Sequence, residues 1–429
     1  MYPNLYYVFN DFFGVEWNWL KIFNSFGFFV AIAFIAAAWI LALELKRKQL
    51  LGILTYTEKN ITVGAPATFS ELLLNFIFGF IIGFKLIGIM IVPDALNDPQ
   101  SFILSRQGSW GFGLLIGIFF AGMKWREKNK VKLAKPEKRV IRIWPHDRIG
   151  DLVIYAAVFG FVGAKIFDNL EHWNTFIADP VDGLLSFSGL TFYGGLICAT
   201  LAIYFYSKKH KIPMVHLCDA AAPGLMLAYA IGRIGCQIAG DGDWGILNTA
   251  FISNNNGKLI SSINADIQNI IKTNSNYYSQ QFATFNHVQS LNVKPFLGLP
   301  NWLFGYNYPH NVADEGMALA GCTGRYCHVL PISVFPTPFY ETIMCLILFA
   351  GLWLLRKKIT TPGKIFSIYL FVNGLERFLI EKIRVNTKYS ILGFHPTQAE
   401  LISTCLIIAG IALWIVQSKK YKSKIIRSK

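Results

Sequence analysis

A permanently charged residue stands inside a stretch of the chain that is otherwise apolar. Arg233 lies near the end of an apolar run that begins around Val215, and the glycine-rich loop 240–245 follows it. A guanidinium does not deprotonate in a protein, and placing it in a membrane span costs at least about 2.5 kcal/mol. Such a residue indicates a functional site. The alternative is an arginine that snorkels to the membrane surface.

A second arginine occupies the later apolar run 363–383. Arg377 precedes Glu381 by four residues, so the two side chains can pair on a helix and lower the cost of burying both. At 100° per residue, one helical face is expected to hold four polar residues: Asn373, Arg377, Glu381 and Arg384. The alternative is an ion pair that only locks helix packing.

The composition is that of an integral membrane protein. Of 429 residues, 53% are hydrophobic and only 15% are charged, whereas soluble domains carry about a quarter charged residues. Apolar runs of sufficient length predict about nine transmembrane helices. They are expected near residues 25–44, 71–92, 108–124, 150–168, 189–207, 216–238, 338–355, 363–383 and 397–417. The predicted fold is an all-α polytopic membrane protein.

The basic residues indicate orientation rather than nucleic-acid binding, although the formal charge is +15. Most of them follow alternate apolar runs: 46–59, 124–148, 208–211, 356–364 and 419–429. Cytoplasmic loops carry this excess of Lys and Arg. The pattern therefore places the N-terminus outside and the C-terminus in the cytoplasm.

The chain is expected to divide into four parts. Residues 1–245 carry the first six helices, two of them in an insertion at 60–125. Residues 246–333 form a small extracytoplasmic head with some strand content, 334–418 the last three helices, and 419–429 a basic cytoplasmic tail. Cys322 and Cys327 lie in the head, on the oxidising side, and could form a disulfide. No cysteine pair has zinc-site spacing with histidines, so no metal site is expected.

The topology brings the polar residues to one depth. Tyr193, Arg233 and Arg377 are all expected near the outer surface. Two guanidiniums that face one cavity repel each other unless an anion lies between them, and the planar fork of arginine suits a phosphate. In an outer leaflet, the abundant phosphate is a phospholipid head group, so the residues predict a lipid-phosphate site. Asp219 lies about 21 Å from Arg233 along a helix, too far to pair with it.

At these residues the sequence resembles the prolipoprotein diacylglyceryl transferase family. The family signature is similar to Gly232-Arg233-Ile234-Gly235 with Gly240-Asp241 and Trp244-Gly245. The family's His-Gly-Gly-Leu-Ile motif resembles Tyr193-Gly194-Gly195-Leu196-Ile197, and its His-Pro-Ser-Gln-x-Tyr-Glu motif resembles 335–341, which ends in Tyr340-Glu341. Arg377 with Glu381, and Asp219, also have counterparts. The resemblance covers roughly 150–245 and 333–417.

The resemblance implies a reaction, its partners and the residues at its site. The family transfers the diacylglyceryl group of phosphatidylglycerol to the lipobox cysteine of a prolipoprotein in the bacterial cytoplasmic membrane, without a cofactor. It implies catalytic roles for Arg233, Arg377 and Tyr193. The residues expected at the phospholipid are Gly194, Gly195, Gly235, Gly240, Asp241, Asn373, Glu381, Arg384 and Tyr340. Asp219 and Glu341 are expected to be structural polar residues.

Two positions depart from the family pattern. Tyr193 replaces the histidine, and tyrosine, with an ordinary pKa of about 10, is a poor base; Asn373 replaces a tyrosine. Three explanations are open: the arginines depress Tyr193, an acid such as Asp241 or Glu381 assists, or the histidine's role is positional. The glycines at 194, 195 and 235 also permit close helix packing. The rival functions are an anion or lipid transporter and a non-catalytic lipid-binding factor.

Overall fold

The computed structural model describes residues 1–92, 95–96, 99–185, 191–282, 288–386, 389 and 394–427. The chain divides into two compact units. The first comprises Met1–Val15, Phe23–Glu44 and Val215–Lys429, and the second comprises Glu16–Ile22 and Leu45–Met214.

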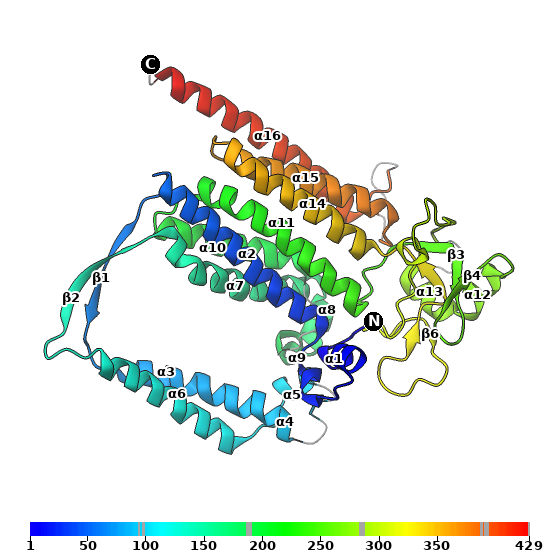
Figure 1. Ribbon diagram of the computed structural model, residues 1–429, viewed down its shortest axis with the longest axis horizontal. Helices are drawn as coiled ribbons and strands as arrows, with labels where there is room; N and C mark the ends of the chain where they lie inside the picture. Colours follow the sequence, from blue (N-terminus) through cyan, green and yellow to red (C-terminus); the bar gives the residue numbers. More distant parts are fainter. Residues whose placement is uncertain are drawn as a thin grey trace. The chain divides into compact units, whose positions relative to one another are not determined.

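Helices form most of the first unit. They are α1 (Leu5–Phe13), most of α2 (Ser25–Leu50), α11 (Met214–Ala239), α14 (Thr337–Lys358), α15 (Lys364–Ile380), the short η6 (Glu381–Ile383) and α16 (Gln398–Arg427). Helices α11, α14, α15 and α16 run side by side (Figure 1). A buried cluster joins the first three, through Met226, Cys345 and Ile365. Gly374 lets α15 approach α16 closely, since a Cβ there would lie 2.7 Å from the carbonyl oxygen of Ser403.

The head between α11 and α14 contains strands, as the sequence predicts. Its elements are β3 (Leu247–Ser253), β4 (Leu259–Ser261), α12 (Ile267–Thr273), α13 (Ser275–Phe282), β5 (Ser290–Leu291), η5 (Asn301–Leu303), β6 (Met317–Ala318), β7 (His328–Val329) and β8 (Ile332–Val334). Strand β3 pairs antiparallel with β4 and β8 and parallel with β5, and β6 pairs with β7. A disulfide joins Cys322 to Cys327. The core of the head includes Tyr278, Tyr308 and Ile332, and it extends to Trp244 in the loop after α11.

The second unit contains two helix pairs and a ribbon. Its elements are η1 (Asn18–Ile22), β1 (Thr57–Val63), α3 (Phe69–Ile81), the π-helical η2 (Ile82–Ile87), α4 (Gly88–Ile91), α5 (Pro99–Leu104), α6 (Trp110–Lys130), β2 (Glu137–Ile143), η3 (Pro145–Arg148), α7 (Ile149–Glu171), α8 (Trp173–Ala178), α9 (Pro180–Leu185) and α10 (Phe192–Lys209). Helix α3 packs on α6, and α7 packs on α10. Strand β1 precedes α3 in the chain and β2 lies between α6 and α7, and the two strands pair antiparallel (Figure 1). These two strands are not among the elements predicted from the sequence.

The prediction of a helical membrane protein is confirmed in its general form. Within the described residues, six helices are long and apolar enough to cross a membrane. They are Ser25–Leu50, Phe69–Ile91, Pro145–Glu171, Met214–Ala239, Thr337–Lys358 and Gln398–Tyr421. The other three predicted spans coincide with α6, α10 and α15, which are not among the six. The count of nine and the orientation therefore stay predictions.

Asp219 fixes the beginning of α15. Its carboxylate oxygens accept hydrogen bonds from the backbone N–H groups of Gly363, at 2.7 Å, and Phe366, at 2.9 Å. The first N–H groups of a helix have no partner within the helix. Asp219 is almost fully buried, so it supplies acceptors where water does not. This contact explains an aspartate in α11 that lies far from Arg233 along the helix.

We predict that Asp219→Ala lowers the melting temperature of the detergent-solubilised protein. Two buried donors would lose their acceptor, which costs about 1–3 kcal/mol each. The matched control is Asp266→Ala, which removes the exposed cap of α12 on the Asn269 N–H and should cost about 1 kcal/mol. Equal melting temperatures for the two variants would contradict the assigned role of Asp219.

Candidate active site

The candidate site is built around the loop 240–246, which follows α11. Gly240 and Gly242 have φ angles of +65° and +97°, a region that other residues rarely adopt. The turn they form carries Asp241 and Asp243 back beside the end of the helix. Gly245 lies so close to the chain after α15 that a Cβ would be 2.6 Å from the carbonyl oxygen of Ile383.

Two charged side chains hold the guanidinium of Arg233. Its Nη1 pairs with Oδ2 of Asp243, and its Nε pairs with Oε2 of Glu341 at the start of α14. The ring of Tyr229, one helical turn earlier, lies 5.4 Å from the guanidinium carbon, within the range of a cation–π contact. Arg233 is therefore oriented by its neighbours rather than extended toward solvent, and its side chain is 15% exposed.

Arg384 closes these pairs into a ring. Its Nη2 lies 2.6 Å from Oδ1 of Asp243, and its Nη1 lies 3.1 Å from Oε1 of Glu341. Arg233, Asp243, Arg384 and Glu341 thus alternate in charge around a closed circuit, which we call the charge ring. Each member has two partners of opposite charge. Each contact joins one nitrogen to one carboxylate oxygen, so every member bridges its two neighbours through charge-assisted hydrogen bonds, which are stronger than neutral ones.

Arg377 and Glu381 attach to the charge ring. Nη1 of Arg377 lies 3.6 Å from Oε1 of Glu341, and its Nη2 lies 2.9 Å from Oε2 of Glu381. Glu381 also accepts hydrogen bonds from Asn386, at 2.6 Å, and Thr397, at 2.7 Å. The predicted Arg377–Glu381 pair is present, and Glu341 joins it to Arg233.

The prediction of one helical face was wrong for Arg384. Helix α15 ends at Ile380 and a 3-10 turn follows, so Arg384 has extended backbone and pairs with Gly245 in a β-bridge. The N–H of Ile246 also donates to the carbonyl oxygen of Ile383 at 2.9 Å. Arg384 reaches the site because the chain leaves the helix.

The sequence patterns indicate only a structural role for Glu341 and do not indicate Asp243. Glu341 contacts all three arginines from a completely buried position. A carboxylate therefore lies between the guanidiniums, where the sequence argument placed a phosphate. The signal that could have revealed Asp243 is its position two residues after Asp241, in a loop that also contains Gly240, Gly242 and Gly245. No pattern in the sequence marked Asn386 or Thr397.

The charge ring is most exposed to solvent at Asp243, whose side chain is 39% exposed, whereas that of Arg384 is 8% exposed. Burial raises the pKa of Asp243, but the charges of Arg233 and Arg384 outweigh burial and lower it to about 2. Burial, and then the charge of Asp243, raise the pKa of Asp241. The pKa values of two carboxylates two residues apart are thus shifted in opposite directions, a pattern that distinguishes acid from base in active sites.

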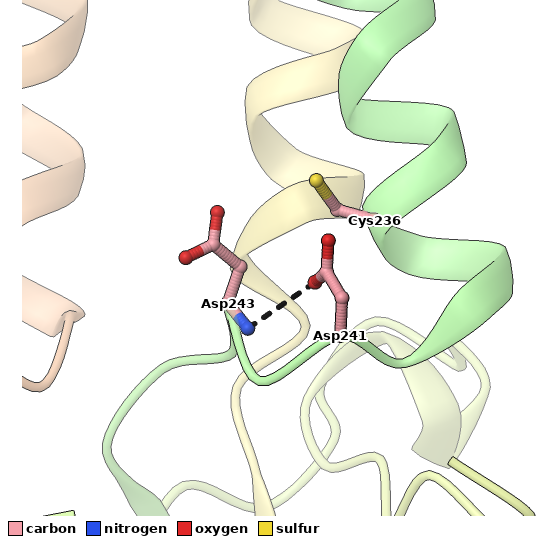
Figure 2. A group of neighbouring side chains, drawn as sticks. All are labelled: Cys236, Asp241 and Asp243. Carbon is pink, nitrogen blue, oxygen red and sulfur yellow. Dashed lines mark hydrogen bonds between the residues drawn. The ribbon is translucent and has the colours of Figure 1, made fainter. Parts of the chain in front are cut away.

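Cys236, Asp241 and Asp243 offer donor atoms that lie within 4.8 Å of one another (Figure 2). In Figure 2 the N–H of Asp243 points to the carboxylate of Asp241, a contact of 3.3 Å. Both oxygens of Asp243 already bind guanidiniums. A divalent cation would meet two positive charges at this position, so the electrostatics favour an anion over a metal ion.

Two other predicted residues stand apart from the charge ring. The hydroxyl of Tyr340 donates to the carbonyl oxygen of Leu303 in the head. Asn373 is half-buried, and its side chain makes no hydrogen bond to the part of the chain that the structure describes. Gly235 serves packing, since a Cβ there would lie 3.0 Å from Cβ of Phe29 in α2.

The residues 193–195 belong to the second unit, at the start of α10. Gly194 and Gly195 face α7, where a Cβ on either would lie within 3 Å of a backbone oxygen, that of Gly163 or Gly160. Both glycines therefore allow close helix packing. Tyr193 is half-buried in the first turn of α10. Its role at the site stays a prediction.

Comparison with known proteins gives one consistent family. The family model of prolipoprotein diacylglyceryl transferase matches residues 109–416. Phosphatidylglycerol–prolipoprotein diacylglyceryl transferase of Dehalococcoides mccartyi is 26% identical over 329 residues, which are 76% of this chain and 95% of the relative. The protein of the same name from Clostridium novyi is 27% identical, over 76% of this chain and 98% of its own length. On the extent of these matches, the chain belongs to the prolipoprotein diacylglyceryl transferase family.

Proposed function

We propose that this protein transfers the diacylglyceryl group of phosphatidylglycerol to the thiol of a lipobox cysteine in a prolipoprotein. The names of the relatives support this reaction. The observation that carries it within the chain is the charge ring, which holds Arg233 and Arg384 side by side at an exposed edge. We further propose that the site faces the outer leaflet of the bacterial cytoplasmic membrane.

The proposed reaction is a displacement at carbon. The thiolate sulfur of the substrate cysteine attacks a glycerol carbon of the lipid, and the bond from that carbon to the phosphate oxygen breaks. Glycerol phosphate leaves with the electron pair, the thiol proton passes to a base, and a thioether forms. The enzyme must stabilise charge that develops on the leaving phosphate, and preorganised guanidiniums are suited to that task.

Asp243 marks where the lipid phosphate would bind. Its two oxygens bridge Arg233 and Arg384, one oxygen to each, as two phosphate oxygens could. It is also the most exposed member of the charge ring and lies on a loop with two glycines of positive φ. We propose that the phosphate takes the place of this carboxylate. Glu341 remains beneath it and keeps both guanidiniums oriented.

Asp241 is the base that we favour for the thiol proton. It accepts a weak hydrogen bond from the Asp243 N–H, at 3.3 Å, and its pKa is raised by burial and by the neighbouring carboxylate. A carboxylate with a raised pKa accepts a proton more readily at neutral pH. The positive field of the arginines also favours the thiolate of an incoming cysteine.

The decisive experiment supplies purified protein with phosphatidylglycerol and a lipobox peptide in detergent–lipid micelles. Mass spectrometry should detect the diacylglyceryl peptide, together with released glycerol phosphate. A transporter or a non-catalytic lipid-binding factor would form neither product. Failure to form the thioether with folded protein would rule out the proposed reaction.

We predict that Arg233→Lys reduces transfer by at least about 100-fold, the loss typical for removal of one charge-stabilising donor. Lysine keeps the charge but lacks the planar fork whose Nη1 and Nε bind Asp243 and Glu341. The matched control is Arg356→Lys, because Arg356 is also buried and pairs with a glutamate, Glu44, at 3.3 Å. Near-normal initial rates for the Arg233 variant would contradict the phosphate clamp.

We predict that Asp241→Asn lowers kcat/KM by about 100-fold or more, since general bases contribute about 10²–10⁴. In the unchanged protein, kcat/KM should fall as the pH drops through the raised pKa of Asp241, because the protonated carboxyl accepts no proton. The control is Asp314→Asn in the head, where the carboxylate pairs with His328. An active Asp241→Asn variant with an inactive Tyr193→Phe variant would assign the base to Tyr193 instead.

A further inference from the structure

Strands β1 and β2 form a two-stranded ribbon whose ends are fixed to membrane helices. At one end, Nη2 of Arg148, just before α7, donates to Oγ1 of Thr57 at 3.0 Å. At the other end, Lys128 of α6 pairs with Glu71 of α3 at 2.8 Å, and the N–H of Leu133 donates to Gly64 at 3.2 Å. Each strand has seven residues, so the ribbon is about 23 Å long.

The ribbon must lie at one surface of the membrane. Strand β1 joins α2 to α3 and strand β2 joins α6 to α7, and three of these four helices belong to candidate membrane spans. Both strands therefore connect helix ends rather than cross the lipid. In the part of the chain that the structure describes, no third strand pairs with either one. An isolated two-stranded ribbon is marginally stable in water, so it needs a surface to bind.

The two faces of the ribbon differ in character. Register pairs place eight residues on one face: the apolar Ile61, Val63, Ile141 and Ile143, and the polar Thr57, Lys59, Glu137 and Arg139. The other face is mostly polar, with Arg142 opposite Glu58 and Lys138 opposite Thr62. Ile141 is 36% exposed, which is unfavourable for a β-branched apolar side chain in water. The first face thus combines apolar side chains with the long basic side chains of Lys59 and Arg139, a combination that suits a membrane–water interface, where such side chains lie along apolar surface and extend their charges to water.

The net basic charge of the ribbon indicates that it binds a surface with anionic groups. The strands carry four basic residues, Lys59, Lys138, Arg139 and Arg142, against two acidic ones, Glu58 and Glu137. Three more lysines precede β2, at 130, 132 and 135. The long stems of such residues lie along apolar surface while their charges reach the head groups. Basic segments at a membrane surface are attracted to anionic lipids.

Aromatic rings stand at the base of the ribbon. Tyr56 and Trp144, the residues just before β1 and just after β2, make an edge-to-face contact with centroids 5.2 Å apart. The guanidinium of Arg142 lies 4.7 Å above the ring of Tyr56. Tyr and Trp are enriched where membrane meets water. From position, exposed apolar residues, aromatic rings and basic charge together, we propose that the ribbon lies in the membrane–water interface and binds the anionic head groups of phospholipids.

Hydrogen–deuterium exchange of the full chain in lipid nanodiscs tests this proposal without relying on enzymatic activity. The protein is compared in discs of phosphatidylcholine alone and in discs that also contain phosphatidylglycerol. Amides of residues 57–63 and 137–143 should exchange about tenfold more slowly with the anionic lipid, because bound head groups hold the ribbon closed. High salt should remove that protection in the unchanged protein.

The test variant is the triple substitution K138Q/R139Q/R142Q, at exposed positions of the ribbon. It should lose the protection by phosphatidylglycerol. The matched control, K208Q/K209Q/K211Q, removes the same charge from the end of α10 and the loop after it and should retain the protection. Equal exchange of the unchanged protein in both lipids would overturn the proposal. Equal loss of protection in the two variants would also overturn it, because the effect would then belong to the surface charge in general.

Discussion

The site depends on a carboxylate that is completely buried among three arginines. Breaking a buried ion pair by removing one partner costs about 3–5 kcal/mol, because the other charge is left without compensation. Glu341 compensates the charges of Arg233, Arg377 and Arg384 at once. Its removal would therefore take a partner from three guanidiniums instead of one. The guanidiniums are thus fixed before any substrate arrives, which removes the cost of orienting them during the reaction.

The fold supplies the members of the charge ring from three separate segments of the chain. Arg233 and Asp243 come from the end of α11 and its loop, Glu341 from near the start of α14, and Arg384 from beyond α15. Backbone hydrogen bonds join the segments: the N–H of Gly245 donates to Phe335, and that of Ile246 donates to Ile383, both at 2.9 Å. Trp244 belongs to the core of the head, so packing in the head also positions the loop.

The sequence predicted the parts of this site better than their connections. Arg233, Arg377 and Glu381 were identifiable because a charge in an apolar run is costly, and the spacing of the last two places them together on a helix. The position of Arg384 was not predictable from helical periodicity, since α15 ends before it. The role of Glu341 depends on long-range contacts with Arg233, Arg377 and Arg384, which lie 36 to 108 positions away, and no local pattern encodes them. The strands β1 and β2 were not predicted because their basic residues conceal the alternation of apolar and polar residues.

A closed circuit of paired charges also limits how this site can change over evolutionary time. In the charge ring, each side chain has two partners of opposite charge, so the effects of exchanging two neighbours are not additive. Replacement of Arg233 or Arg384 would remove one ion-pair partner from both Asp243 and Glu341, so a single compensating change at one carboxylate would leave the other altered. We therefore expect substitutions at the four residues to depend on one another, whereas the surrounding helices can change in sequence as long as they keep their apolar character.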